Sequence, residues 1–276
     1  MFTDGFISNC HISVINKIYC GLNIILAVQL ICPMQQQFFI KIKRLSALLI
    51  LICLVPGLAI GHSASIKPKP HKSIRVLIVG GGTSHDFDRW YKQTDAATLS
   101  DNGLCTVIYT HNTDSIGIYL KTADVLYLVT NQPINAENRK AIFDFANTGK
   151  GLILGHPALW YNWKDWPEYN LQLVSGGASE HDRYGSFDES IVNTHHPVTK
   201  GVAQNFTLKD ERYHYVVDPT GPGIEVLANN HVAGSDVVYP SVFIVKNPKT
   251  RIVCIALGHD GESHDIDPYK TLCAMP

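Results

Sequence analysis

Three short apolar runs in this chain end at glycine, and a histidine follows each of them closely. The runs occupy residues 75–79, 151–154 and 251–257, and the histidines are His85, His156 and His259. Short β-branched runs bounded by glycine are typical of buried strands. In an open parallel α/β sheet, ligands bind beyond the carboxyl ends of the strands. The sequence therefore predicts that these three imidazoles meet at one edge of one sheet.

The remaining pattern alternates strands with helices. We expect strands at 74–79, 104–109, 123–129 and 151–154, and helices at 89–100 and 135–146. Asn135 suits the N-cap of the second helix, and glycine follows both helices. Residues 160–185 are aromatic and loop-like, and short extended segments follow around 186–193, 225–229, 241–245 and 251–257. This order predicts one α/β domain of three layers with a mainly parallel sheet.

The N-terminal part has the composition of an export signal. Basic residues at 41–44 precede the apolar stretch 45–60, and small residues follow it, which predicts a signal peptide at 34–63 and a linker at 64–73. The stretch is shorter than the ~20 residues of a membrane-spanning helix, although an uncleaved anchor is the alternative. Residues 1–33 are either an upstream artefact or an extra hydrophobic segment. We expect an exported domain at 74–276 with no membrane contact after cleavage.

Charge and cysteine content exclude several classes of protein. Residues 1–61 carry four basic residues and one acidic residue, so their removal changes the net charge from −1 to about −4. The sequence has no cluster of excess basic residues, so nothing in it indicates a nucleic-acid partner. The domain keeps Cys105, Cys254 and Cys273. An odd number at wide spacing disfavours a disulfide framework or a zinc motif, and buried apolar cysteines are the ordinary interpretation.

Two glycine-bounded motifs are compatible either with a catalytic role or with a purely structural role. The loop Gly80-Gly-Gly82 lacks both dinucleotide and P-loop signatures. Behind it, His85-Asp86 either caps the next helix or supplies an acid/base group. Gly155-His156-Pro157 lies where a nucleophile elbow would lie, but histidine replaces the serine or cysteine. His156 would therefore act as a general base or a metal ligand rather than a nucleophile.

The tryptophan-rich segment 160–166 also has two interpretations. Trp160, Tyr161, Trp163 and Trp166 follow one another closely. They form either a piece of core or a lid, which is commoner, or a platform on which a sugar ring stacks.

Carboxylates and imidazoles also cluster at 179–182 and 210–214. Surface ion pairs are the ordinary explanation. His156, His181, Glu211 and His259 are nevertheless the best set of nitrogen and oxygen ligands for a divalent ion. They are scattered in sequence, and no pair has the i, i+4 spacing of a compact metal motif. We therefore expect no metal and no other cofactor, with a divalent ion bound by these residues as the alternative.

Six motifs in order resemble those of the ThuA-like (trehalose utilisation) family. They are Gly81–Asp86, Gly155–Ala158, Gly176–His181, His196–Gly201, Asp210–Tyr213 and Ala256–Asp260, within a stretch from about Arg75 to Leu272. The resemblance implies a flavodoxin-like, class I glutamine amidotransferase-like fold without the amidotransferase cysteine. It also implies a role in the catabolism of trehalose or a related disaccharide, including 3-keto sugars.

Two functional hypotheses follow for a small-molecule carbohydrate partner. The chain is either a hydrolase, lyase or isomerase, or a non-catalytic carbohydrate-binding protein. As an enzyme it would use His85, His156, Glu211 and His259 for acid/base chemistry, with Glu211 orienting or sharing the proton transfer. The expected substrate-binding residues are Asp86, Trp160, Tyr161, His181, Tyr213, His214 and Asp260.

The C-terminus departs from the family pattern. The family usually continues through a further helix, whereas this sequence stops at Thr271–Pro276. We expect either a truncated or frameshifted end, or a domain without that helix. A missing helix would leave apolar sheet surface uncovered, which a marginally stable domain tolerates poorly.

Overall fold

The computed structural model describes residues 72–101 and 103–274. The chain divides into two compact units, Met1–Lys67 and Pro68–Pro276, and all described residues belong to the second. The expected signal peptide, the upstream segment 1–33 and most of the linker lie outside the described residues. Within the described ranges, no helix has the length and apolar character needed to span a membrane.

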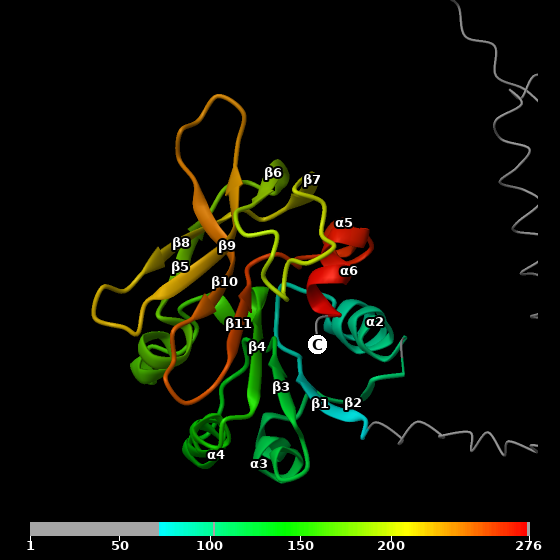
Figure 1. The fold of residues 1–276 in the computed structure, drawn as a ribbon. Helices are drawn as coiled ribbons and strands as arrows, with labels where there is room; N and C mark the ends of the chain where they lie inside the picture. The colour runs from blue at the N-terminus through cyan, green and yellow to red at the C-terminus, as the bar shows by residue number, and fades with distance from the viewer. Residues whose placement is uncertain (1–71, 102, 275–276) are drawn as a thin grey trace, which may run out of the picture. The chain divides into compact units, whose positions relative to one another are not determined.

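A nine-stranded sheet forms the centre of the second unit (Figure 1), in the order β2-β1-β3-β4-β11-β10-β9-β6-β7. The first five strands run parallel, and each of the last four is antiparallel to its neighbour. The bounds are β1 Ile74–Val79, β2 Cys105–Thr110, β3 Val125–Leu128, β4 Gly151–Gly155, β6 Gly185–Ile191, β7 Asn205–Asp210, β9 Ile224–His231, β10 Tyr239–Val245 and β11 Ile252–Ile255. A small second sheet pairs β5 (Gly176–His181) with β8 (Tyr213–Val217).

Helical segments cover both faces of the large sheet. One face carries the π-helical segment η3 (Asp88–Asp95), α2 (Ala96–Ser100), α5 (Gly261–His264) and α6 (Asp267–Cys273). The other carries the 3₁₀ turn η4 (Thr113–Ser115), α3 (Ile116–Leu120), α4 (Ala136–Asn147) and the π-helical η6 (Tyr169–Val174). A 3₁₀ turn, η5 (His156–Leu159), follows β4 directly. The domain therefore has three layers.

Strand β1 shows why the sheet is buried on both sides. Leu77 and Val79 pack into the cluster formed with α3 and α4. Val76 and Ile78 pack into the opposite cluster, with Trp90 and the other aromatic residues around η3. Side chains alternate between the faces of a strand, so a strand covered on both faces must be apolar throughout.

The fold class predicted from the sequence is confirmed. The four expected parallel strands and both expected helical regions are present, and Asn135 caps α4 by accepting a hydrogen bond from the backbone N–H of Asn138. The extended segments after residue 185 correspond to β6, β9, β10 and β11. Cys105, Cys254 and Cys273 are free, and the latter two are buried.

Three regions differ from the expectation. The segment 160–185 is not all loop, because it contains η6 and β5. Strands β7 and β8 were not expected, and Glu211 lies in the short connection between them. The C-terminal segment forms α5 and α6, and α6 covers the sheet with Tyr269, Leu272 and Cys273, all buried.

Candidate functional site

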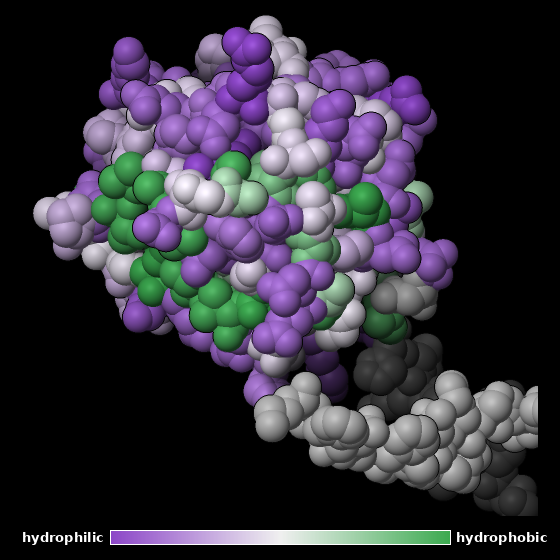
Figure 2. Space-filling view, turned by 90° about the horizontal axis from the view of Figure 1, so that it is seen from above, coloured by the Kyte–Doolittle hydropathy of each residue, from purple (hydrophilic) through white to green (hydrophobic). Residues whose placement is uncertain are grey.

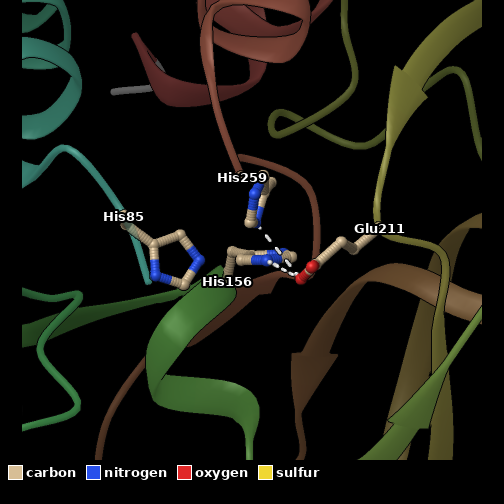
Figure 3. A group of neighbouring side chains, drawn as sticks. All are labelled: His85, His156, Glu211 and His259. Carbon is tan, nitrogen blue, oxygen red and sulfur yellow. Dashed lines mark ion pairs between the residues drawn. The ribbon is translucent and has the colours of Figure 1, made fainter. Parts of the chain in front are cut away.

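Four side chains from distant parts of the sequence converge beyond the carboxyl ends of the parallel strands (Figure 3). His85 follows β1, His156 follows β4, His259 follows β11, and Glu211 lies between β7 and β8. One ligand-capable atom of each lies within 4.8 Å of those of the others. Glu211 Oε2 is 3.5 Å from His156 Nε2 and 3.2 Å from His259 Nδ1. The structure thus brings together the four residues that the sequence predicted as catalytic.

Glycine makes room for two of the histidines. A Cβ atom at Gly155, directly before His156, would lie 2.7 Å from the Val129 side chain. Gly258, directly before His259, has φ +120° and would place a Cβ 2.8 Å from the Tyr269 hydroxyl. A side chain at either position would have to displace these neighbours, so glycine gives both turns the room they use.

The loop after β1 is held in a strained conformation that aims His85. Ser84 has φ +72°, in the left-handed region that non-glycine residues rarely adopt. His85 Nδ1 lies 3.2 Å from the carbonyl oxygen of Thr83, which leaves Nε2 facing the cluster. Strain of this kind costs of order 1–3 kcal/mol and concentrates at functional sites.

His156 is the most enclosed member of the cluster. Its side chain is fully buried, and its ring stacks on Tyr213 with the centroids 4.1 Å apart. Nδ1 donates to the carbonyl oxygen of Ala256 at 2.7 Å. The opposite nitrogen, Nε2, is buried and meets the Glu211 carboxylate as an ion pair without a well-aligned hydrogen bond, and so does His259 Nδ1. His85 Nε2 is buried without a hydrogen-bonding partner among the described residues.

Asp210 links Glu211 and His259 through hydrogen bonds with their backbone N–H groups. This fully buried carboxylate accepts hydrogen bonds from the backbone N–H groups of Glu211 at 2.6 Å, Gly258 at 2.8 Å and His259 at 3.3 Å. The Ser263 hydroxyl also donates to it. The antiparallel strand β7 is therefore fastened to the loop that follows β11.

The charges in the cluster act on one another. Burial alone would raise the pKa of Glu211, but the imidazoles of His156 and His259 outweigh it and hold this pKa well below its usual range. The neighbouring Glu211 carboxylate raises the pKa of His259 against the effect of burial. Burial lowers the pKa of His85 to about 3, and the charge of His156 adds to this effect. At neutral pH the site therefore holds an ionised carboxylate beside a neutral His85.

The rim of the site contains some of the expected binding residues. His181 Nε2 is 3.8 Å from Glu211 Oε1, and the His181 side chain is 36% exposed. Trp160 contacts the rings of both His181 and Tyr213. Tyr184 donates its hydroxyl hydrogen to Asp260 at 2.7 Å and lies against His259. These groups surround the cluster on the side of β5 and β8.

A hollow opens on the other side, beside His85. It has a volume of about 430 Å³, within the range of small-molecule sites. Gly81, Gly82, His111 and Gln132 line it together with Tyr109, whose buried hydroxyl has no partner among the described residues. The face at the top of Figure 1, where α5 lies, is mostly hydrophilic with hydrophobic residues gathered toward one side (Figure 2). The side chains of Asp86, His111 and Gln132 at the hollow offer polar groups to a ligand rich in hydroxyl groups.

Several predicted binding residues have structural roles. Asp86 is exposed and accepts a hydrogen bond from the backbone N–H of Arg89 at the start of the η3 helical segment, and it also lines the hollow beside His85. His214 pairs with Asp182 at 2.8 Å and stacks on Tyr239, outside the four-residue cluster. Tyr213 is buried and its ring stacks on that of His156, so its side chain is not exposed to a ligand.

The tryptophan-rich segment divides between the core and the rim. Trp163 and Trp166 are buried in the main core cluster, so a platform of all four aromatic residues is wrong. Trp160 is half-buried beside the cluster, and Tyr161 is 41% exposed. Only these two can meet a ligand.

Sequence analysis missed the groups that support the cluster. In the sequence Asp210 stands out only as part of a charged run, and no motif marks Tyr109, Gln132 or Tyr184. His264 and Asp95 form a buried pair, Nδ1 to Oδ1 2.7 Å, and His264 Nε2 faces the Gly258 carbonyl oxygen at 3.1 Å. No sequence signal marks these pairs, because they join residues far apart in the chain.

The donor set of the cluster is suited to a metal ion. It differs from the set considered from sequence in one member, since His85 takes the place of His181. The scattered sequence positions, which argued against a metal, do not separate the residues in space. Three imidazole nitrogens and a carboxylate are ligands that zinc and similar ions prefer.

Comparison with known proteins gives one family and a group of solved structures. The family described as ThuA, trehalose utilisation, matches residues 75–274. A search of curated proteins gives no match. A ThuA-like protein from Parabacteroides merdae is 18% identical with a TM-score of 0.65, over 74% of this chain and 88% of that one. A ThuA-like protein from Bacteroides uniformis is 18% identical with a TM-score of 0.60, over 77% and 92%.

A more distant neighbour is the glutaminase domain of Trypanosoma brucei CTPS, 11% identical with a TM-score of 0.47, over 73% of this chain and 91% of that one. The two ThuA-like structures share the fold of this chain, and the family match spans the whole three-layer domain. The chain belongs to the ThuA (trehalose utilisation) family.

Proposed function

We propose that this protein is a carbohydrate-processing enzyme whose reacting centre is the cluster of His85, His156, Glu211 and His259. Membership of the trehalose utilisation family supports a carbohydrate-related role. The choice of an enzyme over a binding protein rests on one observation. Three buried ring nitrogens that form no well-aligned hydrogen bond among the described residues surround one carboxylate, and two of them contact it as ion pairs.

Such an arrangement costs stability unless it serves a purpose. A buried polar atom without a partner costs about 1–3 kcal/mol, and natural proteins keep few of them. A binding site for a sugar needs paired hydrogen-bonding groups and a surface for stacking, and it gains nothing from three orphaned imidazole nitrogens. A reacting centre uses them, because imidazole transfers protons or binds metal ions at neutral pH.

The surroundings supply two places for a sugar. On one side, Trp160 and His181 form the rim next to Glu211. On the other, Tyr109, His111 and Gln132 line the hollow beside His85. A disaccharide lying across the cluster would place one ring on each side, with the bond between them near the imidazoles. We propose a hydrolase, lyase or isomerase acting on such a substrate.

The test is turnover of trehalose and of its 3-keto derivative by purified protein, followed by NMR. We expect His85→Asn and Glu211→Gln to lower kcat at least about 100-fold. Tyr109→Phe removes only a hydroxyl at the hollow, so we expect it to raise KM with little change in kcat. His231→Ala, on β9 and outside the cluster, serves as the matched control. Sugar binding without any turnover would favour the carbohydrate-binding protein instead.

The proposed site of action is outside the cytoplasm. This proposal is supported only by the charged, apolar and small-residue order of residues 41–65, which lie outside the described part of the chain. Mass spectrometry of the mature protein should find an N-terminus near Gly61 to Ala64. A cytoplasmic protein that retains residues 34–63 would contradict it.

A further inference from the structure

The four side chains of the reacting centre are spaced as ligands of one metal ion. A tetrahedral ion with bonds of about 2.0–2.2 Å holds its ligand atoms roughly 3.4 Å apart. Glu211 Oε2 lies 3.5 Å from His156 Nε2 and 3.2 Å from His259 Nδ1, and the whole set falls within 4.8 Å. Small side-chain movements are enough to close the set around an ion.

The hydrogen bonds of the histidines fix which nitrogen faces the centre. His156 donates its Nδ1 hydrogen to the Ala256 carbonyl oxygen, and His85 Nδ1 lies against that of Thr83. In a neutral ring, the other nitrogen then carries a lone pair. Metal-ligating histidines typically donate their remote N–H to a backbone carbonyl or a carboxylate in this way.

The inward lone pairs need a cation. A divalent cation between His156 Nε2 and the Glu211 carboxylate, whose atoms lie 3.5 Å apart, would meet lone pairs of both. A single divalent ion supplies a partner to every orphaned nitrogen.

We propose that His85, His156, Glu211 and His259 bind a divalent first-row transition ion, with zinc as the reference case. Imidazole-rich sets favour such ions, whereas magnesium and calcium prefer oxygen ligands. A substrate oxygen would then take a fifth coordination position on the side of His181 and Trp160. There the ion would act as a Lewis acid on the sugar, a use that rests on the proposed function. Binding of the ion does not depend on it.

The test uses the full chain, stripped with a chelator and titrated with Zn²⁺ or Co²⁺ alone. We expect one ion per chain by calorimetry and a Co²⁺ absorption spectrum of low-coordinate type, with no competition from millimolar Mg²⁺ or Ca²⁺. Loss of an outer partner of a metal ligand lowers affinity about 10–100-fold, so loss of a ligand in His85→Asn or Glu211→Gln should lower it at least about 100-fold. His231→Ala should bind as the wild type does.

Folding must be separated from binding. His156 is packed against Tyr213 and its variants risk misfolding, so the tests use the less buried His85 and Glu211. Their metal-free forms should match the wild type in circular dichroism and Tm. Failure of the wild type to bind stoichiometric Zn²⁺ or Co²⁺ would overturn the inference, and so would wild-type affinity in both ligand variants. Sugar turnover by protein that binds no ion would reject the metal site and leave the proposed enzyme standing. Metal binding without sugar turnover would support the metal site and count against the proposed enzyme.

Discussion

The carboxylate of Asp210 accepts a hydrogen bond from the backbone N–H of His259, which joins the antiparallel half of the sheet to the parallel half beside the cluster of His85, His156, Glu211 and His259. The two residues are 49 positions apart in the chain, and the donor and acceptor atoms lie 3.3 Å apart. The same carboxylate also holds the N–H groups of Glu211 and Gly258. The relative position of Glu211 and His259 therefore depends on one buried side chain.

We expect Asp210→Asn to destabilise the protein and to disturb the cluster. The amide keeps one acceptor oxygen but turns the other position into a donor that faces backbone N–H groups. The loss should be about 1–3 kcal/mol in the free energy of unfolding by urea. Asp236→Asn, in the exposed β9–β10 loop, is the control and should change it by less than about 0.5 kcal/mol. Equal stability of the two variants would show that Asp210 does not organise this region.

The parallel half of the site could be predicted because its signals are local. A β-branched run followed by glycine fixes where a strand ends, and parallel strands place their ends at one edge. His85, His156 and His259 were therefore expected to meet. The conformation that aims His85 could not be foreseen, since a left-handed serine at position 84 has no sequence signature.

The antiparallel half carries weaker signals. Strand β7 reads Asn-Phe-Thr-Leu-Lys-Asp, and two of its residues are buried, Leu208 and Asp210. In β8, Val216 and Val217 are exposed, so hydrophobicity does not mark its buried face. The same limit applies to the tryptophans, because tertiary packing alone decides that Trp163 is core and Trp160 is rim.

A buried pair beneath the site predicts a second stability effect. His264 and Asp95 are 0% and 1% exposed, and Tyr127 also donates to Asp95 at 2.9 Å. Asp95→Ala removes the acceptor for both groups and should cost about 3–5 kcal/mol in unfolding free energy. Asp88→Ala, on the same helical segment, breaks only an exposed pair with Lys92 and should cost less than about 1 kcal/mol. Similar losses in the two variants would contradict this difference.

The two tryptophans allow sugar binding to be separated from folding. Trp163→Ala should lower the unfolding free energy by about 3–5 kcal/mol, since the ring lies in the core. Trp160→Ala should destabilise the protein less and weaken sugar affinity, measured by calorimetry, because a stacking surface is lost at the rim. Unchanged affinity in Trp160→Ala would place the sugar elsewhere.

Glu189 on β6 predicts how stability depends on pH. Its side chain is fully buried, Oε2 accepts from the Ser241 hydroxyl, and Oε1 has no partner among the described residues. Burial raises its pKa to about 8 from an ordinary 4.5, while the Ser241 hydrogen bond opposes the shift. The folded protein therefore keeps this proton between about pH 4.5 and pH 8, where the unfolded chain has lost it.

Because the folded state binds the extra proton, this group makes stability fall as pH rises through that window, by at most about 1.4 kcal/mol per pH unit. Above pH 8 the slope from this group vanishes. Glu189→Gln keeps the shape and remains neutral, so it should remove the slope and be more stable than the wild type at pH 8. At pH 4.5 the two proteins should be nearly equal. Urea unfolding at pH 4.5, 6 and 8 measures the difference, with Glu225→Gln, on β9 and exposed, as the control. A wild-type slope that survives in Glu189→Gln would show that Glu189 is not the group that titrates.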